Sequence, residues 1–201
     1  MVKKRIMMLG GAYSQIPAIS YAKKSGYEVI TCDYLPDNPG HAYGDKYYNV
    51  STTDMMSVLQ LATELEIDGI VAYASDPAAK TAAFVSNALN LPGASYESVS
   101  ILSEKDRFRE FLMRNAFACP SFLSIMDNET IDDAKLKAFK FPLYVKPVDS
   151  SGSKGISKIY SHQEIEIAVK QASLPSESIL TSTFIAPFSN PTRSMKRCIS
   201  S

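Results

Sequence analysis

The chain has 201 residues, of which 21 are Lys or Arg, 21 are Asp or Glu, and 45% are hydrophobic. This composition is that of a globular protein and excludes collagenous, disordered and disulfide-scaffold classes. At about 100–200 residues per domain, the length allows one large core or two small ones. The net charge of zero lacks the broad positive field of nucleic-acid-binding proteins, so we expect no nucleic-acid partner.

The cysteines and the N-terminus indicate a reducing compartment. Cys32, Cys119 and Cys198 are odd in number and show no Cys-x-x-Cys spacing, which argues against disulfides and a zinc site. We expect Cys32 and Cys119 to be buried as small apolar side chains. The apolar run Ile6–Leu9 is too short for a signal peptide, and no segment has the roughly 20 apolar residues of a membrane span. We therefore expect a cytoplasmic protein with no membrane partner.

Residues 1–95 alternate between predicted strands and predicted helices. Asp54 is expected to cap the second of these helices. Strands that alternate with helices of this length form a parallel sheet with helices on both faces, so we predict an α/β, Rossmann-like domain. The predicted strands lie at 5–9, 27–32, 46–50 and 69–74, and the predicted helices at 14–25, 54–66 and 78–89.

Residues 96–185 follow a different pattern, typical of a small antiparallel α+β unit. An apolar stripe of Phe108, Phe111 and Leu112 within the second of two short helices is expected to belong to the core. We expect residues 186–201 to form an atypical tail. The predicted strands lie at 121–125, 141–145, 155–160 and 179–185, and the predicted helices within 97–115, from 127–133 onward and at 163–172.

The end of the first predicted strand carries a glycine pair. Backbone amides of Gly10 and Gly11 at a helix N-terminus would favour an anion. Asp33 ends the second strand, where dinucleotide-binding folds keep a ribose-binding acid. The full Gly-x-Gly-x-x-Gly pattern is absent, so a tight turn is the simpler interpretation. Because parallel sheets bind ligands at this edge, Gly10 and Gly11 remain candidate substrate-binding residues.

Asp76 is a further candidate for the substrate side. It follows the fourth predicted strand, at the same edge of the sheet. The alternative is that Asp76 caps a helix that starts at Pro77. The histidines, His41 and His162, have no ligand partners at metal spacing, so we expect no metal ligands among them.

The sharpest feature of the sequence is segment 141–156. Lys146 ends an apolar strand, where a charge is costly without an anionic partner. A loop follows whose amides and hydroxyls suit phosphate oxygens, although it lacks the Walker spacing. A flexible hairpin loop is the alternative, because strands flank it. The loop residues that we predict to bind phosphate are Ser150, Ser151, Gly152, Ser153, Lys154 and Gly155.

Three features in order resemble the ATP-grasp superfamily: a Rossmann-like domain, Ser103-Glu104-Lys105-Asp106 opening a helix, and Val145-Lys146-Pro147 with the glycine loop. The resemblance is closest to the carbamoyl-phosphate-synthase and biotin-carboxylase-like branch and covers the chain to about residue 180. It implies a ligase that joins a small-molecule carboxylate to a nucleophile through an acyl phosphate, with ATP and Mg²⁺ as cofactors. It also implies that Lys105 and Lys146 contact ATP phosphates and that the glycine loop closes over them.

The C-terminal residues depart from the family pattern. Where the resemblance implies acidic residues after Leu180, the chain has Thr181-Ser182-Thr183. The second half of the family's ATP site, which holds the Mg²⁺ ligands, is not recognisable after Ile185. Without metal neutralisation of the phosphates, we expect no ligation by this chain alone. No acid follows Glu177, so we predict a change of reading frame near residue 181, with a truncation or a natural short protein as alternatives.

Two functions therefore stay open. The first is the ATP-binding part of an ATP-grasp ligase, which we expect to form homo-oligomers through exposed apolar surface. The second is a non-catalytic Rossmann-like module that binds a small ligand at Gly10 and Gly11.

Overall fold

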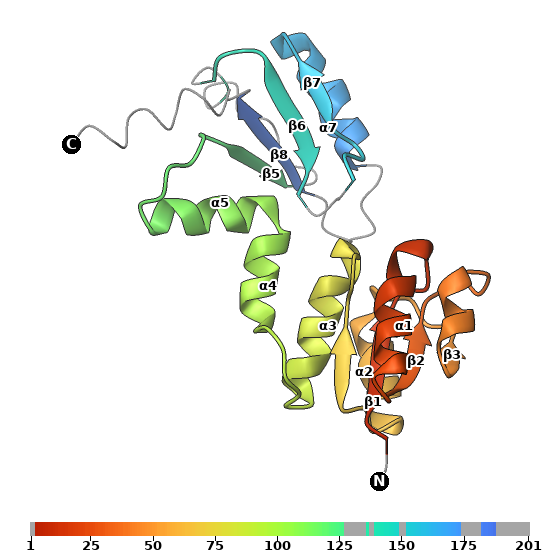
Figure 1. Ribbon diagram of the computed structural model, residues 1–201. Coiled ribbons are helices and arrows are strands. Elements are labelled where there is room, and N and C mark those ends of the chain that lie inside the picture. Colours follow the sequence, from red (N-terminus) through yellow and green to blue (C-terminus); the bar gives the residue numbers. More distant parts are fainter. Residues whose placement is uncertain (1–2, 127–135, 137–138, 149–151, 174–181, 188–201) are drawn as a thin grey trace. The chain divides into compact units, whose positions relative to one another are not determined.

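The computed structural model describes residues 3–126, 136, 139–148, 152–173 and 182–187 (Figure 1). The chain divides into two compact units, Met1–Ser103 and Glu104–Ser201, whereas the sequence analysis placed a boundary after residue 95. Helix α4 (Tyr96–Ser103) falls in the first unit because it is tied to the preceding helix: the Tyr96 amide donates to Asn87 Oδ1 over 2.9 Å. Among the described residues, no helix has the length and apolar character to span a membrane.

The first unit contains a parallel sheet with the strand order β3-β2-β1-β4. Met7 of β1 pairs with Ile30 on one side and with Ile70 on the other. This order, with crossovers through helices, confirms the Rossmann-like prediction. The strands are β1 (Arg5–Leu9), β2 (Glu28–Cys32), β3 (Lys46–Tyr48) and β4 (Gly69–Val71).

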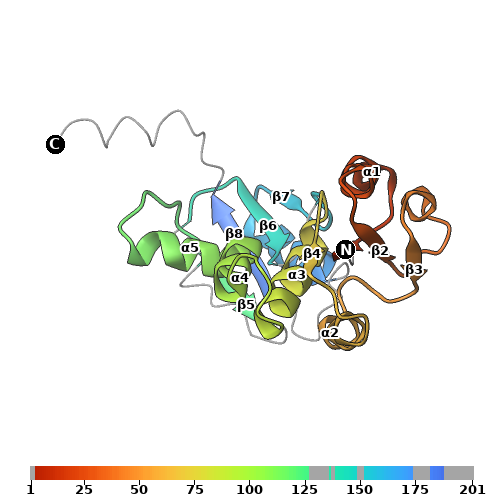
Figure 2. The same ribbon diagram turned by 60° about the horizontal axis from the view of Figure 1, so that its bottom comes forward.

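Helices cover both faces of this sheet. Successive residues of β1 face opposite sides, so Met8 packs with Ile19 of α1 whereas Met7 packs with Val58 of α2 and Val85 of α3. Figure 2 shows α1 and α2 on opposite sides of the strands. The helical elements are η1 (Tyr13–Gln15), α1 (Ile16–Lys24), η2 (Pro39–Tyr43), α2 (Met55–Glu64) and α3 (Asp76–Ala88).

Two local predictions for this unit had different outcomes. Asp54 caps α2 as predicted, because its Oδ1 accepts a hydrogen bond from the Ser57 amide over 3.1 Å. The sequence analysis predicted no helix between the strands at 27–32 and 46–50, but this segment contains the short helix η2. Pro39 opens η2, where its fixed φ and missing N–H are tolerated.

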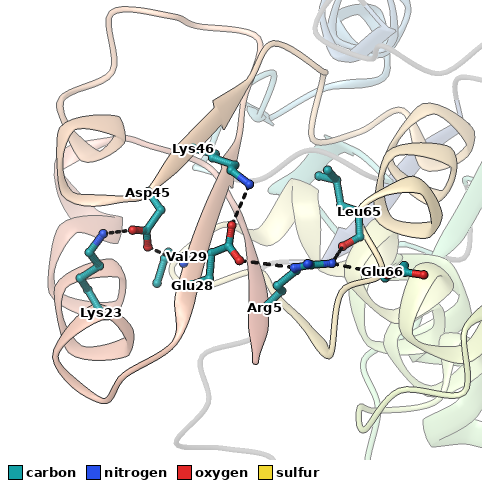
Figure 3. A network of polar contacts seen from close by, with 8 residues as sticks. All are labelled: Arg5, Lys23, Glu28, Val29, Asp45, Lys46, Leu65 and Glu66. Atoms are coloured by element: carbon teal, nitrogen blue, oxygen red, sulfur yellow. Dashed lines mark hydrogen bonds and ion pairs between the residues drawn. The ribbon is translucent and has the colours of Figure 1, made fainter. Parts of the chain in front are cut away.

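A network of charges ties together the N-terminal ends of the strands (Figure 3). Glu28 accepts from Lys46 Nζ over 2.8 Å and from Arg5 Nε over 3.3 Å. The Lys46 hydrogen bond is the main reason why the pKa of Glu28 lies below its ordinary value. Asp45 accepts from Lys23 and from the Val29 amide, and these contacts likewise lower the Asp45 pKa. The network joins three neighbouring strands at the edge opposite the glycine pair.

The second unit contains an antiparallel sheet with the strand order β5-β8-β6-β7. The core on one face joins Leu143 and Val145 of β6 to Ile165 and Ala168 of α7 (Figure 1). The α+β prediction for this unit is confirmed. Its elements are α5 (Lys105–Arg114), β5 (Leu123–Met126), β6 (Leu143–Pro147), β7 (Ser157–Ile159), η3 (His162–Glu164), α7 (Ile165–Ser173) and β8 (Ser182–Pro187).

The apolar stripe of α5 differs from its prediction. Phe108 and Leu112 are half-buried and Phe111 is 41% exposed, so the helix buries none of its residues. The prediction that this stripe belongs to the core is wrong, because α5 rests its apolar side only partly against its unit. The helix predicted from 127–133 and the tail residues 188–201 lie outside the described residues.

Candidate functional site

Lys146 lies on the face of β6 that is opposite the core. Along the strand Leu143 and Val145 are fully buried, whereas Tyr144 and Lys146 are half-buried. Because side chains alternate along a strand, Tyr144 and Lys146 share the face that α7 does not cover. The Lys146 side chain can therefore meet an anion while its strand stays packed against the core.

Lys158 joins these two residues from the neighbouring strand. Tyr144 pairs directly with Lys158 in the antiparallel register, so both project on the same face. Lys146 Nζ lies 5.3 Å from the centre of the Tyr144 ring, and Lys158 Nζ lies 5.2 Å from that of Tyr160, both within cation–π range. We call the surface formed by Tyr144, Lys146 and Lys158 the lysine face. The sequence analysis missed Tyr144 and Lys158, because the strand pairing that unites them was not known.

Lys105 is the first residue of α5 and contacts the residue that follows β6. Its ammonium donates to the Val148 carbonyl over 3.1 Å, and its backbone amide reaches the same oxygen over 3.3 Å. Val148 follows β6 directly. Two lysines from distant parts of the sequence therefore gather where β6 leads into the glycine loop.

The glycine loop is the turn of a hairpin, since β6 and β7 pair antiparallel. Gly152, Ser153 and Gly155 have φ angles of +66°, +61° and +67°, a region that glycine adopts without strain. A Cβ atom on Gly152 would meet nothing within 4 Å, and Lys154 is exposed. The hairpin interpretation is confirmed, and the phosphate-binding role stays a prediction. Of the predicted loop residues, Ser150 and Ser151 lie outside the described residues.

The amides of the glycine pair in the first unit already have acceptors. Gly10 N–H donates to the Cys32 carbonyl over 2.8 Å, and Gly11 N–H donates to Asp33 Oδ2 over 3.0 Å. The carboxylate of Asp33 thus takes the place that the sequence analysis gave to a bound anion. The substrate role of Gly10 and Gly11 stays a prediction, but these two amide donors do not support it.

Asp33 and His41 fix the segment 34–41 next to the glycine pair. Asp33 is 7% exposed and also accepts from the Leu35 amide and from Asn38 Nδ2, over 3.1 and 2.8 Å. The His41 ring covers Gly11 so closely that an added Cβ atom there would lie 2.2 Å from His41 Cε1. This turn is therefore closed by the protein's own side chains.

The cysteines differ in burial. Cys32 is fully buried, as predicted, and burial, with the Asp33 carboxylate as a smaller cause, raises the pKa of its thiol to about 12. Cys119 is only half-buried, so the burial prediction holds for Cys32 alone. In the part of the chain that the structure describes, His, Cys, Asp and Glu side chains form no group of three that could hold a metal ion.

Asp76 is the first residue of α3 and is exposed. Ser75 occupies the N-cap position, so the alternative that Asp76 caps the helix is wrong. The turn before it is held by Gln15, whose Nε2 donates to the carbonyls of Tyr73 and Ala74 over 3.0 and 3.2 Å. Asp76 thus keeps an accessible carboxylate at the edge where the sequence analysis placed a substrate.

Curated relatives match much of this chain, but the chain spans only 18–40% of their length. It is 24% identical over 202 residues to the carbamoyl phosphate synthase large chain of Thermotoga petrophila, which covers 91% of this chain and 18% of that protein. It is 26% identical over 167 residues to the formate-dependent phosphoribosylglycinamide formyltransferase of Herminiimonas arsenicoxydans, with 82% and 40% covered. No protein-family model matches the chain.

Solved structures share the fold. The L-amino acid ligase from Bacillus licheniformis superposes with a TM-score of 0.67 at 22% identity, covering 94% of this chain and 45% of that one. The Staphylococcus aureus N5-carboxyaminoimidazole synthetase complexed with ADP gives 0.70 at 19% identity, with 94% and 49% covered. The MgADP-bound biotin carboxylase domain dimer of Hydrogenobacter thermophilus 2-oxoglutarate carboxylase gives 0.71 at 14% identity, with 94% and 45% covered.

These relatives agree with the resemblance seen in the lysine positions and the glycine loop. The solved structures match 94% of this chain, a share that extends over both its parallel-sheet unit and its antiparallel unit. The chain's similarity to these relatives supports its resemblance to the ATP-grasp superfamily, and the chain spans only part of their length.

Proposed function

We propose that the second unit binds ATP, as the nucleotide-binding part of an ATP-dependent ligase that acts on a carboxylate. The observation that carries this proposal is the presence of two lysines, Lys105 and Lys146, at the same end of β6. Lys105 contacts Val148 with both its amide and its ammonium, and Lys146 projects from the uncovered face of the same strand. Two of the structural relatives are complexes with ADP, which supports the same ligand class.

The residues present fit a nucleoside triphosphate. Ammonium groups neutralise phosphate oxygens as point charges and donate several hydrogen bonds each. The hairpin turn adds Gly152, which leaves its surroundings open, and the exposed Lys154. In the proposed role, Lys105 and Lys146 hold the phosphates, and the turn approaches them with its backbone.

The bound ATP supplies an activated phosphoryl group for a carboxylate substrate. The chain's own contribution is to neutralise and orient the phosphates, since such transfers depend mainly on positioning and electrostatics. Among the described residues, carboxylate, His and Cys side chains form no group of three that could hold a metal ion. Asp76 is the proposed contact on the substrate side. Homo-oligomer formation and a cytoplasmic location stay predictions.

Calorimetric titration with ATP tests the proposal. A hydrogen bond to a charged group contributes about 1.5–3 kcal/mol, so Lys146→Ala should weaken ATP binding about tenfold or more. Lys170→Ala is the matched control, because Lys170 is an exposed lysine on α7, which packs on the other face of the sheet. We expect the control to bind ATP like the unaltered protein. Absence of binding by the unaltered protein, or equal affinity of the Lys146→Ala variant, contradicts the proposal.

The alternative function, a small-ligand module at the glycine pair, has less support. Both amide donors of Gly10 and Gly11 have partners within the protein, and His41 covers the turn. A thermal-shift comparison separates the two functions: ATP or ADP should raise the unfolding temperature under the first, and NAD or another small metabolite under the second.

A further inference from the structure

The lysine face carries more positive charge than Lys146 alone supplies. We propose that Lys146 and Lys158 flank Tyr144 as a two-lysine site for a polyphosphate chain. In this site Lys158 is a second phosphate-binding residue, and Tyr144 is a positioning residue for Lys146. The inference rests on the proposed nucleotide binding for its ligand, and it adds two residues that the sequence pattern did not single out.

The strand register brings the two lysines within reach of one ligand. Tyr144 is directly opposite Lys158, and Lys146 is two residues further along β6. Lys146 and Lys158 are therefore diagonal neighbours on one face, a relation that separates backbone positions by about 7–8 Å. Long, flexible side chains cover this separation, so both ammonium groups can contact phosphates of the same chain.

The local charge favours an anion at this position. The described residues of the β6–β7 hairpin, 139–148 and 152–160, contain four lysines and no Asp or Glu. Lysines therefore outnumber acids in the hairpin, whose one acid, Asp149, lies outside the described residues. Two ammonium groups close together on one surface repel each other, and a polyphosphate relieves that repulsion. The four lysines are Lys140, Lys146, Lys154 and Lys158.

Aromatic rings hold both lysines of the site. The Tyr144 ring lies 5.3 Å from Lys146 Nζ, and the Tyr160 ring lies 5.2 Å from Lys158 Nζ. A cation–π contact restricts the lysine side chain before the ligand arrives. Less side-chain entropy is then lost on binding, which is the positioning role assigned to Tyr144.

Calorimetric titrations with two ligands, ATP and sodium tripolyphosphate in the presence of EDTA, test the proposal. Lys158→Ala should weaken the binding of both ligands by about three- to tenfold. This loss is smaller than that for Lys146→Ala, because Lys158 is more exposed. Lys158→Gln, which removes the charge but keeps a polar side chain one atom shorter, should weaken binding to a similar extent, and Lys170→Ala should change neither affinity. Tyr144→Leu should weaken binding, whereas Tyr144→Phe, which keeps the ring, should restore it. Circular dichroism verifies that each variant is folded.

The outcomes separate this proposal from the proposed function. Unchanged affinity for both ligands in Lys158→Ala overturns the two-lysine site, while ATP binding that depends on Lys146 still stands. Binding of tripolyphosphate but not ATP, weakened by Lys158→Ala, supports the two-lysine site and overturns the nucleotide assignment. Equal affinities of Tyr144→Leu and Tyr144→Phe overturn the positioning role of the ring.

Discussion

The two units of the chain use their polar groups in different ways. At the glycine pair of the parallel-sheet unit, Asp33 accepts hydrogen bonds from Gly11, Leu35 and Asn38. At the opposite end of the same strands, Glu28 is shared between Arg5 and Lys46. These charged groups are satisfied within the protein and fix its turns and strand ends.

The antiparallel unit instead collects cations on one surface. The described part of its β6–β7 hairpin has lysines and no acids, and Lys146 and Lys158 rest against tyrosine rings. A charged side chain that is paired within its own unit is already neutralised and has less charge to offer a ligand. A surface that keeps one sign of charge is the better candidate for an anion site.

The largest expected effect distinguishes the two faces of β6. Leu143 is fully buried on the core face, and Leu143→Ala should lower the free energy of unfolding by about 2–5 kcal/mol. Lys146→Ala, on the other face, should change that free energy by about 0.5 kcal/mol or less. Urea unfolding, with hydrogen exchange of peptides from β6 and α7, measures both. Similar losses of stability in the two variants would show that Lys146 serves folding rather than binding.

The second prediction concerns the closed turn of the first unit. A Cβ atom on Gly40 would lie 2.5 Å from the Gly11 carbonyl oxygen, which also accepts the Gly40 amide over 2.6 Å. Backbone atoms cannot yield as a flexible side chain does, so Gly40→Ala should cost about 2–3 kcal/mol of stability. ATP affinity should be unchanged, because this turn belongs to the other unit.

Gly26→Ala provides the matched control for the Gly40 variant. Gly26 has a φ of +90°, and an added Cβ atom there would meet nothing within 4 Å. Only the positive φ then opposes the substitution, so Gly26→Ala should lower the free energy of unfolding by about 1 kcal/mol. Urea midpoints of the two variants are compared at equal slope. A loss for Gly26→Ala as large as that for Gly40→Ala rules out close packing of the turn as the cause.

Local chemistry explains the parts of the fold that were predictable from the sequence. The bounds of β1 follow from a short apolar run ending in two glycines, and the start of α2 follows from the capping carboxylate of Asp54. Lys146 was recognisable because a charge within an apolar strand is costly unless it reaches solvent or an anionic partner. Each of these features depends on residues within a few positions of one another.

The remaining features depend on contacts between distant residues. From the sequence, the Asp33 carboxylate could bind a ligand or accept hydrogen bonds from its own chain. In the structure the segment after Asp33 places Asn38 where its side chain donates to Asp33. Tyr144 and Lys158 meet only in one hairpin register, and a shift by one residue would place them on opposite faces. The described turn residues Gly152 and Ser153 have positive φ, but the sequence pattern does not reveal the register of their hairpin.

The smallest expected effect is a pH dependence in the strand-end network. The pKa of Glu28 lies below its ordinary value of 4.5, chiefly because Lys46 donates a hydrogen bond to it. A carboxylate whose pKa is lower in the folded chain stabilises the protein above its ordinary pKa. That stability is lost as the pH falls through the lowered pKa. Asp45, paired with Lys23, shifts in the same direction and adds to the loss.

Glu28→Gln should therefore flatten the fall in unfolding free energy between about pH 5 and pH 3. Glu66→Gln is the control: Glu66 lies 3.6 Å from the same Arg5, but its side chain is 85% exposed. Solvent screens such an exposed pair, so the control should keep the slope of the unaltered protein. Urea unfolding at a series of pH values measures the slopes. Equal flattening by both variants would mean that general surface charge, rather than the Lys46 hydrogen bond, sets the acid sensitivity of the parallel-sheet unit.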